Sequence, residues 1–287
     1  MNIRKLSTIL FLMLFGFANA QDDLMKELDS NSSKKEPVSA AFKGLQIANM
    51  QSTKLPAKKE WYFLVSHRFG DLTNGINNFF GLDNANTKIG GVYGVTDWLS
   101  LSASRHTFQK TYELAAKYRI MSQQENGFPV TIVGYNTVDA RTDVTKKLYP
   151  DITFSNHLAY STQLLVSRKF SENFSAQLAP MFIHKNLYDA IYDQKNYVMM
   201  GAGMRYKISK RVSINADYAA RLNLPDEYSG IYHNPFSIGM DIDTGGHIFQ
   251  MLFSNCQAMN DVSYYTLAPG INGGKGIFFG FNLYRVF

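Results

Sequence analysis

Short runs in which apolar and polar side chains alternate are the feature of this chain that most constrains its fold. In the run 212–222, for example, Val212 and Ile214 alternate with Ser213 and Asn215. A period of two places successive side chains on opposite faces of an extended chain, so each run predicts a β-strand with one apolar and one polar face. No stretch after residue 20 is apolar for long enough to form a membrane-spanning helix, so only a closed barrel would cross a bilayer.

Twelve such runs follow residue 59, divided by clusters of Gly, Asn, Asp and Ser. They are expected over 60–68, 87–95, 98–106, 111–121, 128–138, 154–169, 174–185, 197–208, 212–222, 236–243, 247–255 and 276–287. Their connections alternate in length: short ones are expected at 96–97, 122–127, 170–173, 209–211 and 244–246, and most others, such as 69–86, 139–153, 223–235 and 256–275, are long. Tight turns at one end and longer loops at the other are typical of an outer-membrane barrel with an even number of strands and both termini in the periplasm.

The sequence therefore predicts an all-β fold, an up-and-down antiparallel transmembrane β-barrel of about twelve strands over residues 60–287. A soluble β-sandwich would show the same alternation with its apolar face turned inward, and it stays open as the alternative. The end of the chain favours the barrel. Ile277, Phe279, Phe281 and Leu283 fall in phase with the terminal Phe287, and together they form an apolar ladder suited to lipid.

The first twenty residues are typical of a secretory signal peptide. Arg4 and Lys5 begin it, an apolar stretch spans 6–17, and small residues end it at Ala18 and Ala20. A dozen apolar residues are too few for a helix across a bilayer, which needs about 20. We therefore expect cleavage after Ala20 and export to the outer membrane of a Gram-negative bacterium.

Residues 21–59 differ from the rest and are expected to form a periplasmic segment before the barrel. The stretch 22–35 is polar and Ser-rich, which favours disorder, while 38–50 is expected to form a short helix near the periplasmic mouth of the barrel.

Composition excludes several classes of protein. A formal charge of +6 is too small a surplus on so long a chain for a nucleic-acid footprint. The single Cys, Cys256, allows neither an internal disulfide nor a cysteine-built metal site. With 18% charged against 45% hydrophobic residues, the chain carries few charges for its length, which fits contact with lipid as well as water.

Four motifs in the first half resemble, in their order and spacing, an uncharacterised family of Bacteroidota outer-membrane barrels known only as a domain of unknown function. They are VSHRFG at 65–70, NFFGLDNAN at 78–86, YGVTDWLSL at 93–101 and KTYELAAKYR at 110–119. In the second half the resemblance rests on GHIFQMLFSN at 246–255 and on the terminal strand. Relatives often carry a Gly-His pair just before the first strand, where this chain has Asn49, Met50 and Gln51. The resemblance implies a barrel fold in an outer membrane and brings no activity or substrate.

A barrel lipid hydrolase would need a Ser nucleophile beside a His base on one face of a strand. Ser155 with His157 and Ser104 with His106 are two residues apart, which places each pair on one face. Their order is the reverse of the His-x-Ser order of barrel phospholipases and deacylases, and no carboxylate or Asn is evidently placed to orient either His. We therefore expect no enzymatic activity and no catalytic residues.

Two acidic clusters are candidates for cation binding. Asp241 and Asp243 resemble the start of a cation loop, but no further oxygen ligands follow at calcium-loop spacing. Asp83, Asn84 and Asn86 are more typical of Asx turns. The sequence therefore predicts no metal site and no cofactor.

The inward-facing phase of four expected strands carries charges of both signs, and these residues are the candidate lumen lining. They are Glu113, Lys117, Arg119, Arg205, Lys207, Asp217, Arg221, Asp241 and Asp243. Twelve strands enclose an interior between the filled lumen of about eight strands and the open channel of about sixteen. The charges either line a narrow selective pore or pair with one another and close it, and both alternatives stay open.

The favoured function is a small channel or transport-related barrel for a polar or anionic small solute, because the lumen set has five basic members against four acidic ones. The rival is a closed structural or partner-binding barrel, whose long loops 69–86 and 256–275 cap the mouth or dock another outer-membrane protein. Outer-membrane lipid is a partner in both cases, and nucleic acid in neither.

Overall fold

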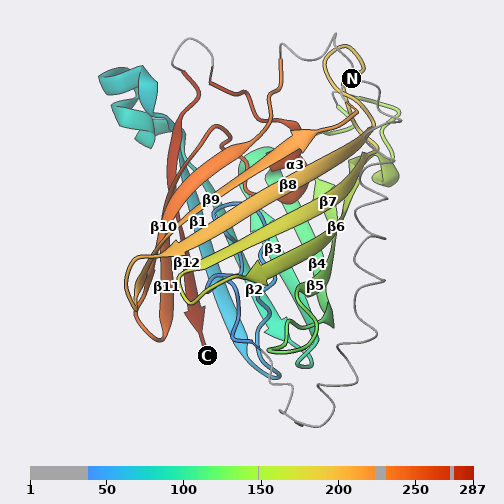
Figure 1. Ribbon diagram of the computed structural model, residues 1–287. Coiled ribbons are helices and arrows are strands. Elements are labelled where there is room, and N and C mark those ends of the chain that lie inside the picture. Colours follow the sequence, from blue (N-terminus) through green and yellow to red (C-terminus); the bar gives the residue numbers. More distant parts are fainter. Residues whose placement is uncertain (1–37, 148, 224–230, 272–274) are drawn as a thin grey trace, which may run out of the picture.

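The computed structural model describes residues 38–147, 149–223, 231–271 and 275–287, so the expected signal peptide (1–20) and the disorder expected over 22–35 lie outside the described residues. The described chain forms twelve strands around one closed barrel (Figure 1). The strands are β1 (Trp61–Asp71), β2 (Asn86–Gly94), β3 (Leu99–His106), β4 (Thr111–Met121), β5 (Thr131–Arg141), β6 (Leu158–Lys169), β7 (Phe174–Lys185), β8 (Asn196–Lys207), β9 (Val212–Arg221), β10 (Phe236–Asp243), β11 (His247–Ser254) and β12 (Phe278–Val286).

Each strand pairs antiparallel with its neighbours in the chain, and β1 closes the barrel against β12. The predicted all-β fold, an up-and-down antiparallel barrel of twelve strands, is confirmed. Two predicted strand starts were wrong. β5 begins at Thr131 and not at 128, since Pro129 has no N–H to donate to the ladder, and β6 begins at Leu158, after the 3-10 helix η3 (Phe154–His157).

Apolar side chains lie outside the barrel and polar ones lie inside. Leu101, Leu178 and Ile238 are exposed on the outer surface, whereas Gln163 and Asn282 on the inner phase are buried. A soluble sandwich has the opposite arrangement, so that alternative is excluded. No helix in the described part of the chain is long and apolar enough to span a bilayer.

The two ends of the barrel differ in their connections. At the end where the C-terminus lies (Figure 1), which we call the turn end, the strands are joined by residues 95–98, 122–130, 170–173, 208–211 and 244–246. At the opposite loop end they are joined by 72–85, 107–110, 142–157, 186–195, 222–235 and 255–277. The loop-end segments include the 3-10 helices η1 (Leu72–Asn84) and η2 (Phe108–Lys110) and the helix α3 (Asp261–Thr266). The expected alternation in length holds, with the short connection 107–110 as the exception.

Residues 38–59 enter the barrel from the turn end and return to it, and we call this segment the plug hairpin (Figure 1). Its two arms meet at the bridge between Gln46 and Gln51, and its tip closes with the Ile47 N–H donating to the Met50 carbonyl at 2.8 Å. The helix expected over 38–50 was wrong, because these residues form bends and an isolated bridge inside the barrel.

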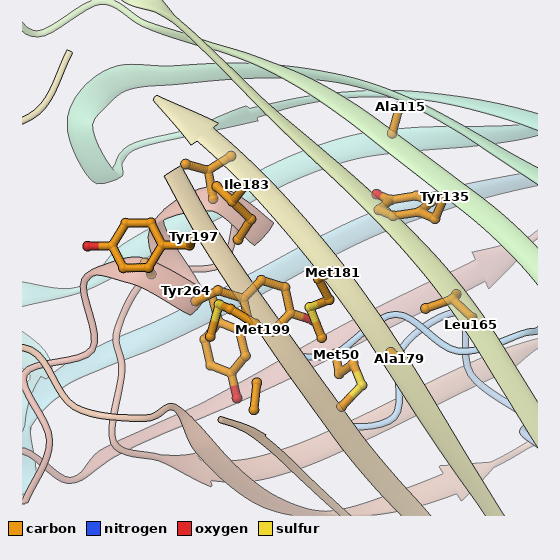
Figure 2. Packing of buried hydrophobic residues seen from close by; sticks show 14 of the residues in the cluster. Met50, Ala115, Tyr135, Leu165, Ala179, Met181, Ile183, Tyr197, Met199 and Tyr264 are labelled. Carbon is orange, nitrogen blue, oxygen red and sulfur yellow. The ribbon is translucent and has the colours of Figure 1, made fainter. Parts of the chain in front are cut away.

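Glycines on β8 make room for the hairpin tip. A Cβ added at Gly203 would lie 2.4 Å from Cδ1 of Ile47, and one added at Gly201 would lie 3.1 Å from Sδ of Met50. Figure 2 shows Met50 within the cluster of buried apolar side chains inside the barrel. The labelled members of that cluster are Met50, Ala115, Tyr135, Leu165, Ala179, Met181, Ile183, Tyr197, Met199 and Tyr264.

The connection between β11 and β12 also enters the barrel. All six residues of α3 are buried, and the helix packs against β6 on the inner wall. Tyr264 and Tyr265 from α3 join the same buried cluster as Met50 of the plug hairpin. Two segments from opposite ends of the barrel therefore meet inside it.

Candidate functional site

The tip of the plug hairpin is held by one carboxylate. Oδ2 of Asp217, on β9, accepts hydrogen bonds from the backbone N–H groups of Ala48 (2.9 Å), Asn49 (2.8 Å) and Met50 (3.0 Å). Its Oδ1 accepts a hydrogen bond from the Tyr264 hydroxyl on α3 at 2.8 Å. Hydrogen bonds to an ionised acceptor are stronger than neutral ones, so this single buried side chain joins the plug hairpin to α3.

Arg68 on β1 is buried beside the same tip. Its Nη2 donates to Oδ1 of Asn49 at 2.6 Å and to Oδ1 of Asn282 at 2.9 Å. Nδ2 of Asn282 in turn donates to the carbonyl of Ala48 at 3.0 Å. The tip is therefore bound from two walls of the barrel, by β9 and by the β1–β12 seam.

Buried side chains also hold the arms of the plug hairpin. Nζ of Lys117 donates to the carbonyls of Leu45 at 3.1 Å and Ser52 at 3.0 Å. Nε2 of Gln250 donates to the carbonyl of Gln46 at 3.1 Å. The backbone carbonyls of the hairpin pair these buried donors, which would lack protein partners if the hairpin left the lumen. The hydrogen bonds therefore stabilise the docked hairpin.

The first residue of α3 connects the helix to both the hairpin and the wall. Oδ1 of Asp261 accepts from Nε2 of Gln51 at 3.4 Å, and its Oδ2 accepts from Gln163 on β6. Burial, together with the nearby Glu113 carboxylate, raises the pKa of the Asp261 carboxyl above its usual range.

A buried charge cluster lies on the wall formed by β2, β3 and β4. Nζ of Lys88 lies 2.9 Å from Oε1 of Glu113, and both side chains are 4% exposed. Oγ of Ser104 donates to the same Oε1 at 3.2 Å and lies 3.0 Å from Nε2 of His106. The cluster borders a cavity of only about 40 Å³ beside the plug hairpin.

This cluster does not have the geometry of a hydrolase triad. In a triad the carboxylate orients the base through Nδ1 and leaves Nε2 for the serine. Here both Ser104 and Glu113 lie on the Nε2 side of His106, whose Nδ1 has no partner within the described residues. The other candidate pair is not formed either: Oγ of Ser155 lies 2.9 Å from the Thr153 hydroxyl, and Nδ1 of His157 donates to the Arg141 carbonyl at 2.7 Å.

A larger cavity, which we call the loop-end cavity, lies between α3 and the loop-end connections. Its volume of about 600 Å³ falls in the range of small-molecule sites. Asp139 and Asn260 line it and are 3% and 1% exposed, and Nδ2 of Asn260 donates to Oδ2 of Asp139 at 2.7 Å. Oδ1 of each residue has no hydrogen-bond partner among the described residues. An unpaired buried acceptor is unfavourable by about 1–3 kcal/mol. Each Oδ1 has almost no accessible area, so a ligand in the cavity would pair it only after the side chain turns toward the cavity.

The remaining lining of the loop-end cavity includes aromatic and charged side chains beside apolar ones such as Val144 and Val262. Tyr149, Tyr188 and Tyr232 line it, together with Arg141, Lys185, His157, Asp189 and Asp193. Its Arg and Lys side chains are already paired: Nε of Arg141 lies 2.6 Å from Oδ1 of Asp143, and Lys185 pairs with Asp193. The lining also carries the carboxyl groups of Asp139, Asp189 and Asp193.

The nine predicted lumen residues are spread along the barrel and do not form one basic lining. Glu113, Lys117, Arg205, Asp217 and Asp241 are buried, while Arg119, Lys207, Arg221 and Asp243 are partly exposed. Their partners differ: Arg205 donates to Ser213, Arg221 to the Tyr265 carbonyl, Asp241 accepts from Gln250, and Asp243 pairs with Lys43. Arg119, Arg205 and Lys207 lie toward the turn end, and none of the nine lines the loop-end cavity.

Several functional candidates were missed from the sequence. Lys88, Asp139 and Lys185 fall in the inward phase of their strands, so the period of two would have found them had every strand been included. Asn260 and Asp261 lie in a long loop whose pattern gives no such signal. Their placement depends on contacts with strands far away in the chain.

In the described ranges, no group of three or more His, Cys, Asp or Glu side chains is arranged to hold a metal ion. Asp83, Asn84 and Asn86 lie at the end of η1 and the start of β2, where the Asn86 Oδ1 accepts from the Thr107 hydroxyl at 3.1 Å. Burial raises the pKa of the Cys256 thiol to about 12, so this residue is a poor metal ligand at neutral pH.

The closed barrel, with its apolar outer surface and polar interior, defines a membrane β-barrel whose lumen is filled from both ends. The chain belongs to the family described as a membrane bound beta barrel domain (DUF5777), which matches residues 42–287. The match confirms the expected membership in a family of membrane barrels and includes most of the plug hairpin. No curated protein matches the sequence.

Solved barrels of similar topology share little sequence with this chain. The KdgM porin is 8% identical with a TM-score of 0.48, and the NanC porin is 10% identical with a TM-score of 0.48; each match covers 78% of this chain and 98% of the porin. The outer membrane protein Omp33 of Acinetobacter baumannii is 9% identical with a TM-score of 0.43, over 81% of this chain and all of that one.

Proposed function

We propose that this protein is a transport-related barrel of the outer membrane of a Gram-negative bacterium, exported by a signal peptide that is cleaved after Ala20. The loop end faces outward and the turn end faces the periplasm, as the positions of long and short connections favour. A small polar solute enters the loop-end cavity, and passage through the lumen requires both the plug hairpin and α3, which Asp217 joins, to move.

The loop-end cavity is the observation that carries this proposal. It combines a volume suited to a small molecule with tyrosine rings and with two buried acceptor oxygens, on Asp139 and Asn260, that lack partners among the described residues. A solute with hydroxyl donors would pair both oxygens once the two side chains turn toward the cavity. Its apolar ring or chain carbons would pack against Tyr149, Tyr188 or Tyr232.

The charge of the cavity favours a neutral polar solute over an anionic one. Arg141 and Lys185 are engaged in ion pairs, so the lining offers no free basic side chain to an anion. The exposed Asp189 carboxylate would also repel an anion. The sequence predicted a polar or anionic solute from the nine lumen residues. Because the basic members of that set lie elsewhere in the barrel, we narrow the prediction to a neutral polar solute.

A pair of solutes of equal size tests the proposal in proteoliposome swelling. The variant Asp217→Ala, in which the plug hairpin is expected to be released, should admit glucose faster than gluconate, because gluconate carries the charge that the cavity lining repels. Changing Asp189→Asn removes one exposed lining carboxylate and should narrow the difference between the rates of glucose and gluconate entry. Asp151→Asn, at an exposed loop position outside the cavity lining, is the matched control and should leave it unchanged.

The alternative is a closed structural or partner-binding barrel, which the filled lumen favours. Asp217 accepts buried hydrogen bonds from the hairpin, and Arg68, Lys117 and Gln250 donate others to it. Such a network suits a permanent plug as well as a movable one. If neither glucose nor gluconate enters vesicles that contain Asp217→Ala with a released hairpin, transport is contradicted and the closed barrel stands. We expect no lipid-hydrolase activity, since neither Ser-His pair is arranged as a triad.

A further inference from the structure

The helix η1 presents an unusual apolar surface at the loop end. Ile76 is 74% exposed, Phe79 and Phe80 are 56% and 55% exposed, and Leu82 is 49% exposed. Asp83 is the only charged residue of the segment. Figure 1 shows this coil standing outside the barrel wall, beside the end of β1. Four large exposed apolar side chains on one short segment are costly in water and mark an interaction surface.

The backbone of η1 holds the two phenylalanines in unfavourable conformations. Phe79 has φ 47° and Phe80 has φ 54°, so both lie in the left-handed region that bulky residues rarely adopt. Such residues cost about 1–3 kcal/mol each and persist only where the surrounding structure requires them. Asn78 supplies part of that restraint, since its Nδ2 donates to the Asp71 carbonyl and its Oδ1 accepts from the Gly81 N–H, both at 2.9 Å.

The same segment is folded back against the end of β1. A Cβ added at Gly81 would lie 2.4 Å from the carbonyl oxygen of Gly70, so glycine is required for this contact, and Gly81 has φ 88°. Nε2 of Gln257 donates to the carbonyls of Phe69 on β1 at 3.1 Å and of Asn84, the last residue of η1, at 2.5 Å, which ties the end of β1 and the end of η1 to the β11–β12 connection. The backbone that carries the aromatic pair is therefore held against the end of β1.

An aromatic belt on the outer surface of the barrel lies at the level where η1 begins. Phe69 stacks on Phe279 with ring centroids 5.7 Å apart, and Phe279 contacts Phe253 at 5.3 Å. Tyr218 and Phe236, opposite each other on β9 and β10, are exposed on the same outer surface. Aromatic residues of membrane barrels collect at the two membrane–water interfaces. Phe69 is two residues before the last residue of β1, and η1 follows directly, so the exposed surface of η1 continues this belt.

We propose that η1 is a membrane anchor, in which Phe79 and Phe80 insert into the interfacial region of the lipid leaflet at the loop end. Three observations support lipid as the occupant: the segment follows directly on the lipid-facing belt, it carries one charge, and its backbone is held against the end of β1. Aromatic side chains are favourable at this depth because their rings pack against lipid while the backbone stays hydrated. This role is independent of whether the lumen conducts.

Tryptophan fluorescence in proteoliposomes tests the insertion directly. The natural Trp61 and Trp98 are first changed to Phe, and a single Trp is introduced as Phe79→Trp or, in a second protein, Phe80→Trp. Emission from either position should shift to shorter wavelength on reconstitution and should be quenched by phosphatidylcholine brominated near the top of the acyl chains. Tyr149→Trp, in the loop-end cavity and away from lipid, is the control and should be quenched by aqueous iodide instead.

Quenching by iodide in both the Phe79→Trp and the Phe80→Trp protein, without quenching by brominated lipid, would overturn the anchor. Protection from both quenchers would also overturn it, because the rings would then pack against protein, either a second copy of the chain or the barrel itself. Heat-modifiable migration in gels confirms that each variant is folded. The two phenylalanine positions serve as independent trials, since either substitution alone can disturb the left-handed backbone.

Discussion

Replacing Asp217 with alanine is expected to release the plug hairpin from the lumen. The change removes the acceptor of three backbone N–H groups and of the Tyr264 hydroxyl, all inside the barrel. At about 1–3 kcal/mol for each buried group left unpaired, the three hairpin N–H groups alone cost the docked hairpin about 3 kcal/mol or more. Release exposes Lys54, so limited trypsin digestion should cleave after this residue much faster than in the unchanged protein.

The matched control for this prediction is Asp243→Asn. Asp243 also binds the hairpin, through Lys43 at 2.9 Å, but both side chains of that ion pair are partly exposed. A pair of this kind contributes about 0–1 kcal/mol, so trypsin cleavage after Lys54 should change little. Equal cleavage rates in Asp217→Ala and in the unchanged protein would show that Asp217 does not hold the tip.

Breaking the buried pair of Lys88 and Glu113 should destabilise the barrel itself. Glu113→Gln leaves the Lys88 ammonium inside the wall without a counter-charge, which is expected to lower the free energy of unfolding by about 3–5 kcal/mol. The double variant Lys88→Met with Glu113→Leu removes both charges and should recover most of the loss, because a buried pair contributes little beyond the cost of desolvating it. Urea unfolding in lipid vesicles measures all of these values.

Asp143→Asn provides the comparison for an exposed pair. Nε of Arg141 lies 2.6 Å from Oδ1 of Asp143, and the two side chains are 34% and 30% exposed, so solvent screens their attraction. The expected change is about 0–1 kcal/mol. If Glu113→Gln lowers the free energy of unfolding as little as Asp143→Asn does, water reaches the Lys88 side chain. The plug hairpin would then not shield this part of the wall from water.

The fold was predictable because every strand carries its own signal. The alternation in the run 212–222 identifies β9 and also the inward position of Asp217, since residues two apart share a face. The outer apolar ladder of β12 is likewise visible in the sequence alone. Strand number, closure and the polar interior all follow from these local patterns, and only strand ends such as that of β5 required the structure.

The filling of the lumen was not predictable in this way. The segment 38–50 has the composition of a short helix, yet its conformation depends on Asp217, which lies 169 residues from Ala48 in the chain. No local pattern reports a contact at that separation. The same holds for α3, whose Asp261 is placed by Gln163, 98 residues away. The sequence therefore identified the nine charged candidates as inward residues. It did not identify the groups that bind most of them inside the barrel.

Single-channel recording in planar bilayers tests most directly the central claim that the plug hairpin closes the lumen and that its release opens it. A Cβ added at Gly203 would lie 3.6 Å from Cγ1 of Ile47, so cysteines at these two positions, with Cys256→Ser, are within reach of a disulfide that locks the tip. Asp217→Ala should conduct in discrete steps, the oxidised cysteine pair in that background should be silent, and a reducing agent should restore the steps. Equal conductance in the locked and reduced proteins, or silence in both, would contradict the account.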